Sequence, residues 1–405
     1  MNFKPLNNES LLVSYAQKAS VSRGRLFDEQ ESAHRSAFQR DRDRIIHTSA
    51  FRRLQFKTQV FVNHEGDHFR NRLTHTIEVA QIARTLSKAL GLNEELAESL
   101  ALSHDLGHTP FGHCGEDVLN QCLSDIGGFE HNAQSLKIVT KLERRYADFD
   151  GLNLTWEALE GLVKHNGPLI DAAGNPTKKY QKNGVPHYVN EFCREFDLEI
   201  DKYSNLEAQV AACADDVAYN NHDIDDGLRA GLFAFEDLYD LPIFGDVLRE
   251  VKNEYADISS TRQMHEANRR LIGLMVEDIL RNTQKNVDKF NIQTPTDVHN
   301  APQTIGNFST EILAAIKSLQ AFLMENMYRS KSVVKERVVA AQIIEDLFET
   351  YLKSPENLPQ DWQIDFDAVA TEVSKRKIGD FIAGMTDRYA ITEHQRLFAS
   401  TPQMR

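Results

Sequence analysis

The sequence predicts an all-α protein with a helical core and additional C-terminal helices. Apolar residues recur at intervals of three and four through most of the chain, for example at Ile82, Leu86 and Leu90, and this is the period of an amphipathic helix. Glycine, proline and helix-capping residues separate the periodic segments. The sequence contains no strand-rich region and no fixed-period repeat.

The composition is that of a globular protein, with 41% hydrophobic and 26% charged residues in a chain of 405. No stretch approaches the roughly 18 apolar residues of a membrane-spanning helix, and the N-terminus lacks the apolar run of a secretory signal. The four cysteines form no CxxC pair. We therefore expect a cytoplasmic protein with no membrane-spanning segment. A net charge of −14 argues against broad nonspecific nucleic-acid binding, although the density of early arginines allows a local basic pocket.

Residues 1–34 are polar and predict a partly ordered N-terminal arm. In the next segment, RSAFQRDRDRIIHTSAFRRLQFKTQV at 35–60, arginine alternates with aspartate before the sequence turns apolar. This alternation has two interpretations, which are a solvated face held by ion pairs and a surface that contacts phosphate. Residues 61–71 predict a loop.

Two consecutive helices follow this loop. The first carries His75 and ends at Gly91, and the second is capped by Asn93 and runs to His104 and Asp105. A glycine and a proline then break the helical pattern. Because a short connection favours antiparallel packing, His75 can approach the end of the second helix.

An acidic residue of a later helix can complete this group. In LEAQVAACADDVAYNNHDIDDGL, both Asp215 and Asp216 lie on the polar side, and periodicity does not choose between them. Imidazole and carboxylate together suit a borderline or hard divalent metal. A lone His–Asp pair is more often a core histidine beside a capping aspartate, but ligand-type residues on three helices favour a metal site.

A second group of polar residues follows the helix break. His108 lies in the turn, His113 and Glu116 share one helix face at a spacing of three, and His131 starts another helix. A carboxylate next to an imidazole can fix its tautomer, and the spacing assigns Glu116 to His113. Together with His104, these histidines fall within 28 residues. Such a cluster is harder to explain by packing than by catalysis.

The remainder of the chain stays helical. Residues 155–166 predict a short helix, in which His165 has no functional claim from spacing, and 171–190 predict a surface loop. Tyr328 lies either at a solvated helix end or within reach of a phosphate chain. Later helices are predicted over 261–282, 310–328 and about 375–390. We expect an arm at 1–34, a catalytic core at 35–235, and a C-terminal helical region at 236–405 packed on that core.

Five segments, in the same order along the chain, resemble the dGTPase-like dNTP triphosphohydrolases of the HD superfamily of metal-dependent phosphohydrolases. They are RDRDRIIHTSAFRRLQFKTQVF, RLTHTIEVAQIAR, SHDLGHTPFGHCGE, GFEHNAQS and ADDVAYNNHDIDDGL. FIAGMTDRYA resembles the C-terminal block of the same family. The HD dipeptide alone is a weak signal, whereas ordered blocks over about residues 35–230 are specific.

The resemblance implies a role for each matched residue. The metal ligands would be His75, His104, Asp105 and Asp215. Asp215 is preferred to Asp216 because Tyr219 and Asp223 follow it at the spacing of the family. The catalytic residues would be His108, His113, Glu116 and His131. Substrate would be bound by Gln59, Tyr219 and Asp223 at the sugar and by Arg53 and Arg72 at the phosphates. The early arginine stretch then becomes one wall of the nucleotide pocket.

The resemblance also implies an HD-domain core that holds a Mn²⁺, Mg²⁺ or Fe²⁺ ion. The implied reaction is the hydrolysis of a dNTP, either dGTP or several dNTPs, to the deoxynucleoside and inorganic triphosphate. This activity is of the EC 3.1.5 type. The expected partners are the dNTP substrate, an activating dNTP at a second site, further copies of the chain in a hexamer or tetramer, and weakly bound single-stranded nucleic acid. Two other classes of function stay open.

One is another HD-type phosphohydrolase, either a phosphodiesterase or a (p)ppGpp hydrolase. The other is a non-catalytic regulator that binds nucleotides or single-stranded nucleic acid.

Overall fold

The computed structural model describes residues 8–59, 70–363, 371–398 and 402. These residues form 17 α-helices with short 3₁₀ and π-helical segments and isolated β-bridges, and the described part of the chain contains no strand. The predicted all-α class is therefore confirmed. None of the described helices is both long and apolar enough to span a bilayer. The loop predicted at 61–71 lies mostly outside the described residues, as does the beginning of the N-terminal arm.

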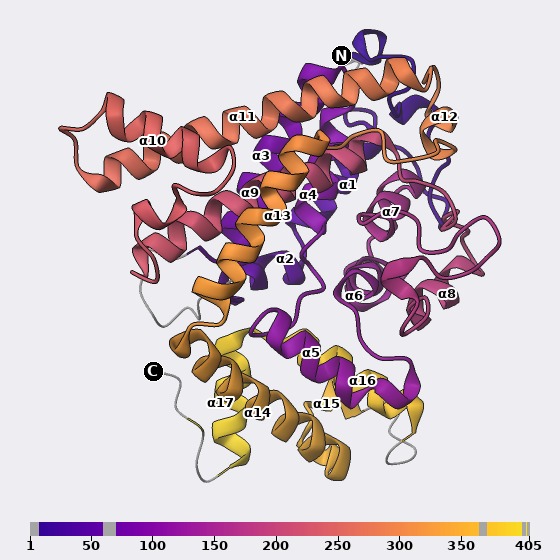
Figure 1. Cartoon of the computed structure of the whole chain (residues 1–405). Coiled ribbons are helices and arrows are strands. Elements are labelled where there is room, and N and C mark those ends of the chain that lie inside the picture. Colours follow the sequence, from indigo (N-terminus) through magenta and orange to yellow (C-terminus); the bar gives the residue numbers. More distant parts are fainter. Residues whose placement is uncertain (1–7, 60–69, 364–370, 399–401, 403–405) are drawn as a thin grey trace.

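Four helices form the central bundle, namely α1 (Ala37–Ile46), α3 (Arg72–Leu90), α4 (Glu94–Ser103) and α9 (Leu206–Arg229). Helix α3 ends where Gly91 adopts a left-handed conformation with φ 70°, and α4 begins where the Asn93 side chain accepts hydrogen bonds from two backbone amides. Both boundaries confirm the sequence prediction. Helices α3, α4 and α9 pack against one another (Figure 1), and this packing brings the predicted histidines and aspartates together.

Five shorter helices complete the core. They are α2 (Ser49–Arg53), α5 (His113–Cys122), α6 (His131–Lys137), α7 (Trp156–Val163) and α8 (His187–Cys193). His131 opens α6 as predicted. The 171–190 segment is mainly loop as predicted, although α8 begins within it.

The C-terminal half contains α10 (Phe244–Glu254), α11 (Ser260–Lys289), α12 (Pro295–His299), α13 (Thr310–Leu323), α14 (Lys331–Lys353), α15 (Gln360–Gln363), α16 (Glu372–Ala383) and α17 (Asp387–Leu397). The helices predicted at 261–282 and 310–328 are confirmed, and the second ends in the π-helical turn Met324–Tyr328. The single helix predicted at about 375–390 is wrong. Helix α16 ends at Ala383 with Gly384 as its C-cap, and the Thr386 side chain caps a separate helix, α17.

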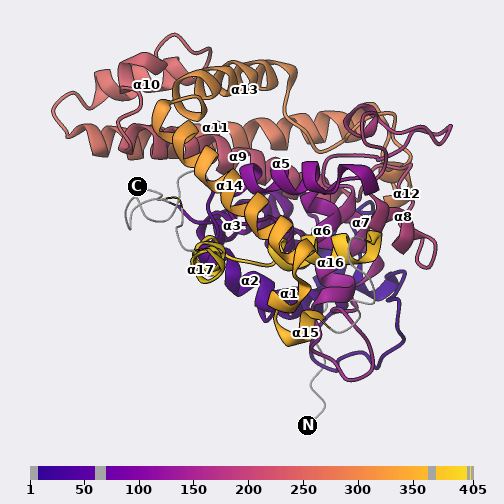
Figure 2. The same cartoon turned by 90° about the horizontal axis from the view of Figure 1, so that it is seen from below.

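The buried apolar side chains form two clusters. The larger cluster fills the α3–α4–α9 bundle and continues into α10, α11 and α13. The smaller cluster joins α5 to α14, α16 and α17, which gather at the lower end of the molecule in Figure 1 and are seen from below in Figure 2. Each cluster draws on both predicted ranges, 35–235 and 236–405. The C-terminal region therefore packs on the core, while the division at residue 235 stays a prediction.

Candidate active site

The first group of predicted residues comes together where α3, α4 and α9 meet. One ligand atom from each of His75, His104 and Asp215 lies within 4.8 Å of the other two. His75 Nε2 is 2.9 Å from Asp215 Oδ1, and His104 Nε2 is 3.6 Å from the same oxygen. Asp105 Oδ1 lies 3.4 Å from His104 Nε2. The four residues predicted as metal ligands are therefore neighbours.

The His104 ring turns a lone pair toward this group. Its Nδ1 donates to the Ala101 carbonyl at 2.6 Å, and its buried Nε2 has no hydrogen-bond partner. Burial lowers the pKa of His104, but the charges of Asp105 and Asp215 outweigh burial and raise this pKa to about 9. The two carboxylates thus favour a positive charge at this point, and a divalent cation would supply it.

A relay of hydrogen bonds orients His75 in the same way. The Glu78 carboxylate accepts a hydrogen bond from His222 Nε2, and the Nδ1 atoms of His222 and His75 are 3.3 Å apart. His222 Nδ1 is then an acceptor, so His75 Nδ1 carries the proton and His75 Nε2 presents its lone pair to Asp215. A lone pair and a carboxylate oxygen repel each other at 2.9 Å unless a cation or a proton lies between them. These donors therefore fit a divalent metal ion.

A buried ion pair holds Asp105. Arg72 Nη1 donates to Asp105 Oδ2 at 2.9 Å, and only 2% of Arg72 is exposed. Gly112, with φ 58°, allows the following loop to pass close to this guanidinium, since a Cβ there would lie 3.2 Å from Arg72 Nη2. Arg72 thus positions a candidate metal ligand, and its contact with phosphate stays a prediction.

The structure separates the two acids that periodicity left equivalent. Asp215 points into the group of candidate ligands, whereas Asp216 is exposed and lies outside it. Consecutive helical residues diverge by about 100°, so two adjacent side chains of α9 cannot face the same point. The packing of α9 against α3 and α4 therefore turns Asp215 toward the histidines, and its role as a metal ligand stays a prediction.

A second group lies beside the first and consists of His108, Glu116 and His131. His131 Nδ1 is 2.9 Å from Glu116 Oε1, and the His131 backbone amide donates to the same oxygen at 3.0 Å. The rings of His108 and His131 stack with centroids 4.2 Å apart. His108 Nε2 is 3.2 Å from Asp105 Oδ1, so His108 connects the two groups.

Glu116 controls the charge of His131. Burial lowers the pKa of His131, but the charge and hydrogen bond of Glu116 outweigh burial and raise this pKa. Burial alone would raise the pKa of Glu116, but His131 lowers it. The assignment of Glu116 to His113 from their spacing is wrong. The glutamate side chain turns instead to the start of α6, where both the amide and the ring of His131 donate to it.

His113 is the exposed member of the cluster. It opens α5, and its ring centroid lies 5.3 Å from that of His108 and 6.2 Å from that of His131. The four residues predicted to be catalytic therefore lie together, with His113 accessible to a ligand.

The chain passes very close to α6 at Gly107, between the two groups. A Cβ at this position would lie 2.1 Å from the His131 carbonyl oxygen and 2.4 Å from the Ser135 amide nitrogen. We expect Gly107→Ala to destabilise the protein by about 2–4 kcal/mol, because backbone atoms must move to accommodate the methyl group. Thermal unfolding would measure the loss. Gly273→Ala is the matched control, since a Cβ there meets nothing within 4 Å and the residue lies inside α11. If Gly107→Ala and the wild type melted at the same temperature, this result would contradict the close packing at Gly107.

Two of the three residues predicted to bind the sugar carry an unsatisfied acceptor. Tyr219 and Asp223 lie one turn apart on α9, the helix that also carries Asp215. Asp223 is fully buried and Gln59 is 9% exposed, and in each residue one side-chain oxygen has no hydrogen-bond partner. Buried acceptors are normally satisfied, so a substrate hydroxyl would complete them.

Arg53 lies in a different cavity. This cavity, of about 280 Å³, lies between the core and the C-terminal helices and is also lined by Gln134, Trp362 and Tyr389. The candidate metal ligands do not line it. The buried Arg53 Nε has no hydrogen-bond partner, and the predicted contact of Arg53 with phosphate stays a prediction.

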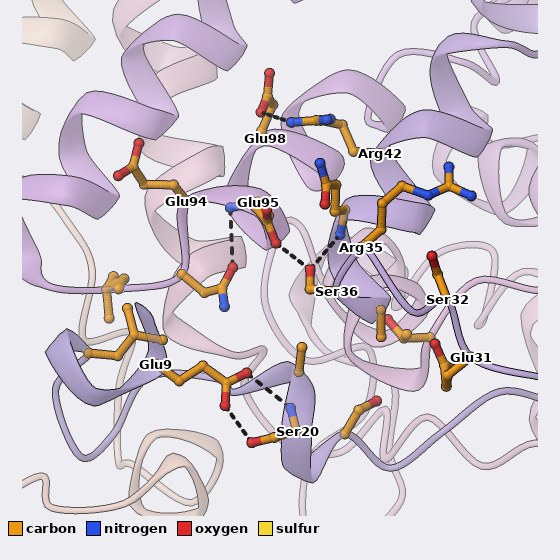
Figure 3. A pocket seen from close by; sticks show the side chains of 18 of the residues that line it. Glu9, Ser20, Glu31, Ser32, Arg35, Ser36, Arg42, Glu94, Glu95 and Glu98 are labelled. Carbon is orange, nitrogen blue, oxygen red and sulfur yellow. Dashed lines mark hydrogen bonds and ion pairs between the residues drawn. The ribbon is translucent and has the colours of Figure 1, made fainter. Parts of the chain in front are cut away.

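The arginine–aspartate stretch forms ion pairs. Arg40 and Arg44 reach Glu29 at 2.9 and 2.7 Å, and Arg25 pairs with the fully buried Asp41 at 2.5 Å. The cavity of about 820 Å³ at this stretch (Figure 3) is lined by glutamates as well as arginines and by none of the candidate metal ligands. The interpretation of this stretch as a wall of the nucleotide pocket is wrong for these arginines, because acidic partners already neutralise them.

Three further residues join the site without a clear sequence signal. His165 Nε2 lies 3.6 Å from Asp215 Oδ2, although His165 follows α7 and is distant in sequence. His222 supports His75, and its position two turns after Asp215 on α9 could have suggested this role. Tyr328 is half-buried and forms a hydrogen bond with Tyr219, so it does not end a solvated helix, and its contact with a phosphate chain stays a prediction.

Comparison with known proteins finds two matching domain families and several close relatives. Residues 72–220 match the HD domain, and residues 306–396 match the phosphohydrolase-associated domain. The deoxyguanosinetriphosphate triphosphohydrolase-like protein 1 of Mesorhizobium japonicum is 52% identical over 392 residues, which cover 97% of this chain and 96% of that protein. Deoxyguanosinetriphosphate triphosphohydrolase-like proteins of Parvibaculum lavamentivorans and Bradyrhizobium diazoefficiens are 52% and 51% identical. These alignments cover 97% and 96% of this chain and 98% and 97% of the relatives. The chain therefore belongs to the deoxyguanosinetriphosphate triphosphohydrolase-like family of HD-domain phosphohydrolases.

Proposed function

We propose that the protein hydrolyses deoxynucleoside triphosphates, either dGTP or several dNTPs, to the deoxynucleoside and inorganic triphosphate. The observation that carries this proposal is the contact between the two groups, in which His108 Nε2 lies 3.2 Å from Asp105 Oδ1 while its ring stacks on His131. A candidate metal site thereby adjoins a carboxylate–imidazole pair suited to proton transfer. The names of the relatives support the substrate class.

The group of His75, His104, Asp105 and Asp215 would hold one divalent cation. A set of two imidazoles and two carboxylates suits Mn²⁺, Mg²⁺ or Fe²⁺. When bound, the cation supplies Lewis acidity toward phosphate oxygens. Arg72 keeps Asp105 in position, and Glu78 keeps the His75 lone pair turned inward through His222.

In this proposal, the chain moves two protons while the bond between the 5′-oxygen and the α-phosphorus breaks. Water adds to phosphorus, and exposed His113 accepts a proton from that water. His131 donates its proton to the departing 5′-oxygen, because an alkoxide is a poor leaving group. Glu116 keeps His131 protonated before this transfer.

The substrate would lie across the same helices. Gln59, Tyr219 and Asp223 would contact the sugar, where two of them offer unsatisfied oxygens. Arg53 and Arg72 would contact the triphosphate, since guanidinium groups match phosphate oxygens in charge and geometry.

Product analysis tests the proposal. The purified protein is incubated with each dNTP and with Mn²⁺ or Mg²⁺, and the products are resolved. We expect deoxynucleoside and inorganic triphosphate in equal amounts. Release of pyrophosphate with a monophosphate, or turnover of cyclic dinucleotides or (p)ppGpp alone, would reassign the protein to another class of HD hydrolase. Binding without any turnover would indicate a regulator.

We propose further that the chain forms a homo-oligomer, either a hexamer or a tetramer. We also propose that an activating dNTP binds at a second site and that single-stranded nucleic acid binds weakly. We propose that the protein is cytoplasmic. Exposed apolar side chains on the C-terminal helices, including Val334, Val338 and Val373, support self-association. Light scattering would measure the oligomer. Mixtures of dNTPs would reveal activation if one nucleotide accelerates hydrolysis of another.

A further inference from the structure

A buried aspartate of the C-terminal region joins two loops of the candidate active site. Asp387 is 2% exposed and opens α17, within the segment that matches the phosphohydrolase-associated domain. Its Oδ2 accepts hydrogen bonds from the Thr58 backbone amide, at 2.8 Å, and from the Thr58 hydroxyl. Its Oδ1 accepts a hydrogen bond from the Phe111 backbone amide at 2.8 Å. One carboxylate thus joins the segment before Gln59 to the turn at 108–112.

A buried lysine holds the other end of this turn. Lys57 is 2% exposed, and its ammonium group donates to the His108 carbonyl and, at 2.9 Å, to the Ala383 carbonyl at the end of α16. The Phe111 side chain is 4% exposed and packs in the smaller apolar cluster with α14, α16 and α17. The C-terminal region therefore holds the 108–112 turn at both of its ends.

The turn depends on these contacts because its backbone is strained. Phe111 has a φ of 60°, a left-handed conformation that a residue with a side chain adopts only when its surroundings enforce it. The hydrogen bond from Thr109 Oγ1 to the Gly112 carbonyl lies within the turn and fixes its shape rather than its place. Gly112 is the N-cap of α5 and has no side chain to cap it. The backbone of the turn therefore sets the position of His113, the first residue of α5.

The other loop has an additional anchor in the core. The Arg72 backbone amide donates to the Lys57 carbonyl at 3.3 Å, and Thr58 pairs with Asn71 in an isolated β-bridge. Both contacts attach this loop to the start of α3. Loss of the Asp387 carboxylate should therefore displace the 108–112 turn and leave Gln59 in place.

We propose that Asp387 is a positioning residue for the hydrolytic reaction, since its hold on the Phe111 amide fixes the turn that places His113 beside His108. This inference rests on the proposed function, in which His113 accepts a proton from the attacking water. It gives the associated domain a specific task, which is to set the geometry of proton transfer from outside the HD domain.

Asp387→Ala tests this inference because it removes all three hydrogen bonds. We expect kcat for dNTP hydrolysis to fall about tenfold and KM to change less than about twofold, because His113 shifts while Gln59 stays in place. Steady-state kinetics would measure both constants. Metal content, measured in parallel, should not change.

A double-mutant cycle with His113→Ala distinguishes positioning from a general loss of structure. In the His113→Ala protein, we expect Asp387→Ala to lower kcat by less than about twofold, because the group that Asp387 positions is already absent. If Asp387→Ala lowers kcat by the same factor in both backgrounds, the inference is overturned.

Asp41→Ala is the matched control. Asp41 is 0% exposed, and its Oδ2 likewise accepts hydrogen bonds from the backbone amide and the hydroxyl of one threonine, Thr155, at 2.9 and 2.6 Å. We expect Asp41→Ala to lower the melting temperature at least as much as Asp387→Ala, with kcat within about twofold of the wild type. A tenfold loss of kcat in Asp41→Ala would show that lost stability alone explains both variants.

If Asp387→Ala does not fold, Asp387→Asn takes its place. An amide accepts through one oxygen only, so at least one of the two backbone amides loses its acceptor. We then expect kcat to fall about threefold, with no further loss in the His113→Ala protein. An equal loss in both backgrounds would again overturn the inference.

Amide hydrogen exchange separates this inference from the proposed function, because it needs no substrate. We expect the Phe111 amide to exchange at least about tenfold faster in Asp387→Ala, or in Asp387→Asn if that variant is used, and at the wild-type rate in Asp41→Ala. If its exchange does not change, the inference fails even when the protein releases triphosphate. If the exchange is faster but no dNTP is hydrolysed, the proposed function fails, while the positioning of the turn by Asp387 is supported.

Discussion

Asp215→Asn is expected to lose its divalent cation and at least about 10³-fold in kcat/KM for dNTP hydrolysis. The Asp215 carboxylate faces both candidate imidazole ligands, with Oδ1 at 2.9 Å from His75 Nε2 and 3.6 Å from His104 Nε2. An amide carries no charge to balance the cation, and several kcal/mol of transition-state stabilisation depend on that cation. Metal content by elemental analysis and steady-state kinetics would measure the two losses.

The neighbouring acid provides the matched control. Asp216→Asn makes the same chemical change one residue away on α9, at an exposed side chain outside the group of ligands. We expect this variant to keep its metal and to lose less than about threefold in activity, as is usual for an exposed substitution. If Asp216→Asn lost the metal and Asp215→Asn kept it, the assignment of ligands on α9 would be wrong.

Glu116→Gln is expected to lower kcat about 10²-fold at alkaline pH and to move the alkaline limb of the pH profile toward lower pH. Glu116 raises the pKa of His131 against the effect of burial, so removal of its charge lowers that pKa. His131 must be protonated to donate to the leaving oxygen. At a given pH above the new pKa, fewer molecules then carry the proton, and the loss of activity is smaller in acid than in alkali. Plots of kcat against pH for both proteins would measure the shift.

Asp117→Asn is the control for this experiment, because Asp117 is adjacent in sequence but exposed, and Arg337 lies 3.5 Å from it as an ion-pair partner. Its pH profile should match that of the wild type. An alkaline limb that stays in place in Glu116→Gln would show that His131 is not the proton donor whose charge Glu116 sets. A uniform loss at every pH would point to a structural role for Glu116.

The sequence predicted the elements that carry the site because their signals are local. Apolar periodicity and the caps at Gly91 and Asn93 located α3 and α4, and the ends of these helices placed His75 near His104 and Asp105. The same apolar pattern predicts one helix over about 375–390, although the Thr386 side chain caps a second helix there. A helix predicted from a local pattern has the correct ends only where the capping residues at both ends are taken into account.

By itself, the sequence determined the all-α class, the helices of the site and the set of imidazoles and carboxylates that they carry. Only the tertiary structure decided which of these groups face one another. It turned Asp215 rather than Asp216 toward the histidines, gave Glu116 to His131 instead of His113, and brought Tyr328 to Asp223 from 105 residues away. The physical reason is that helical periodicity fixes the face on which a side chain lies. The partner opposite that face depends on how distant helices pack, and no local pattern encodes that packing.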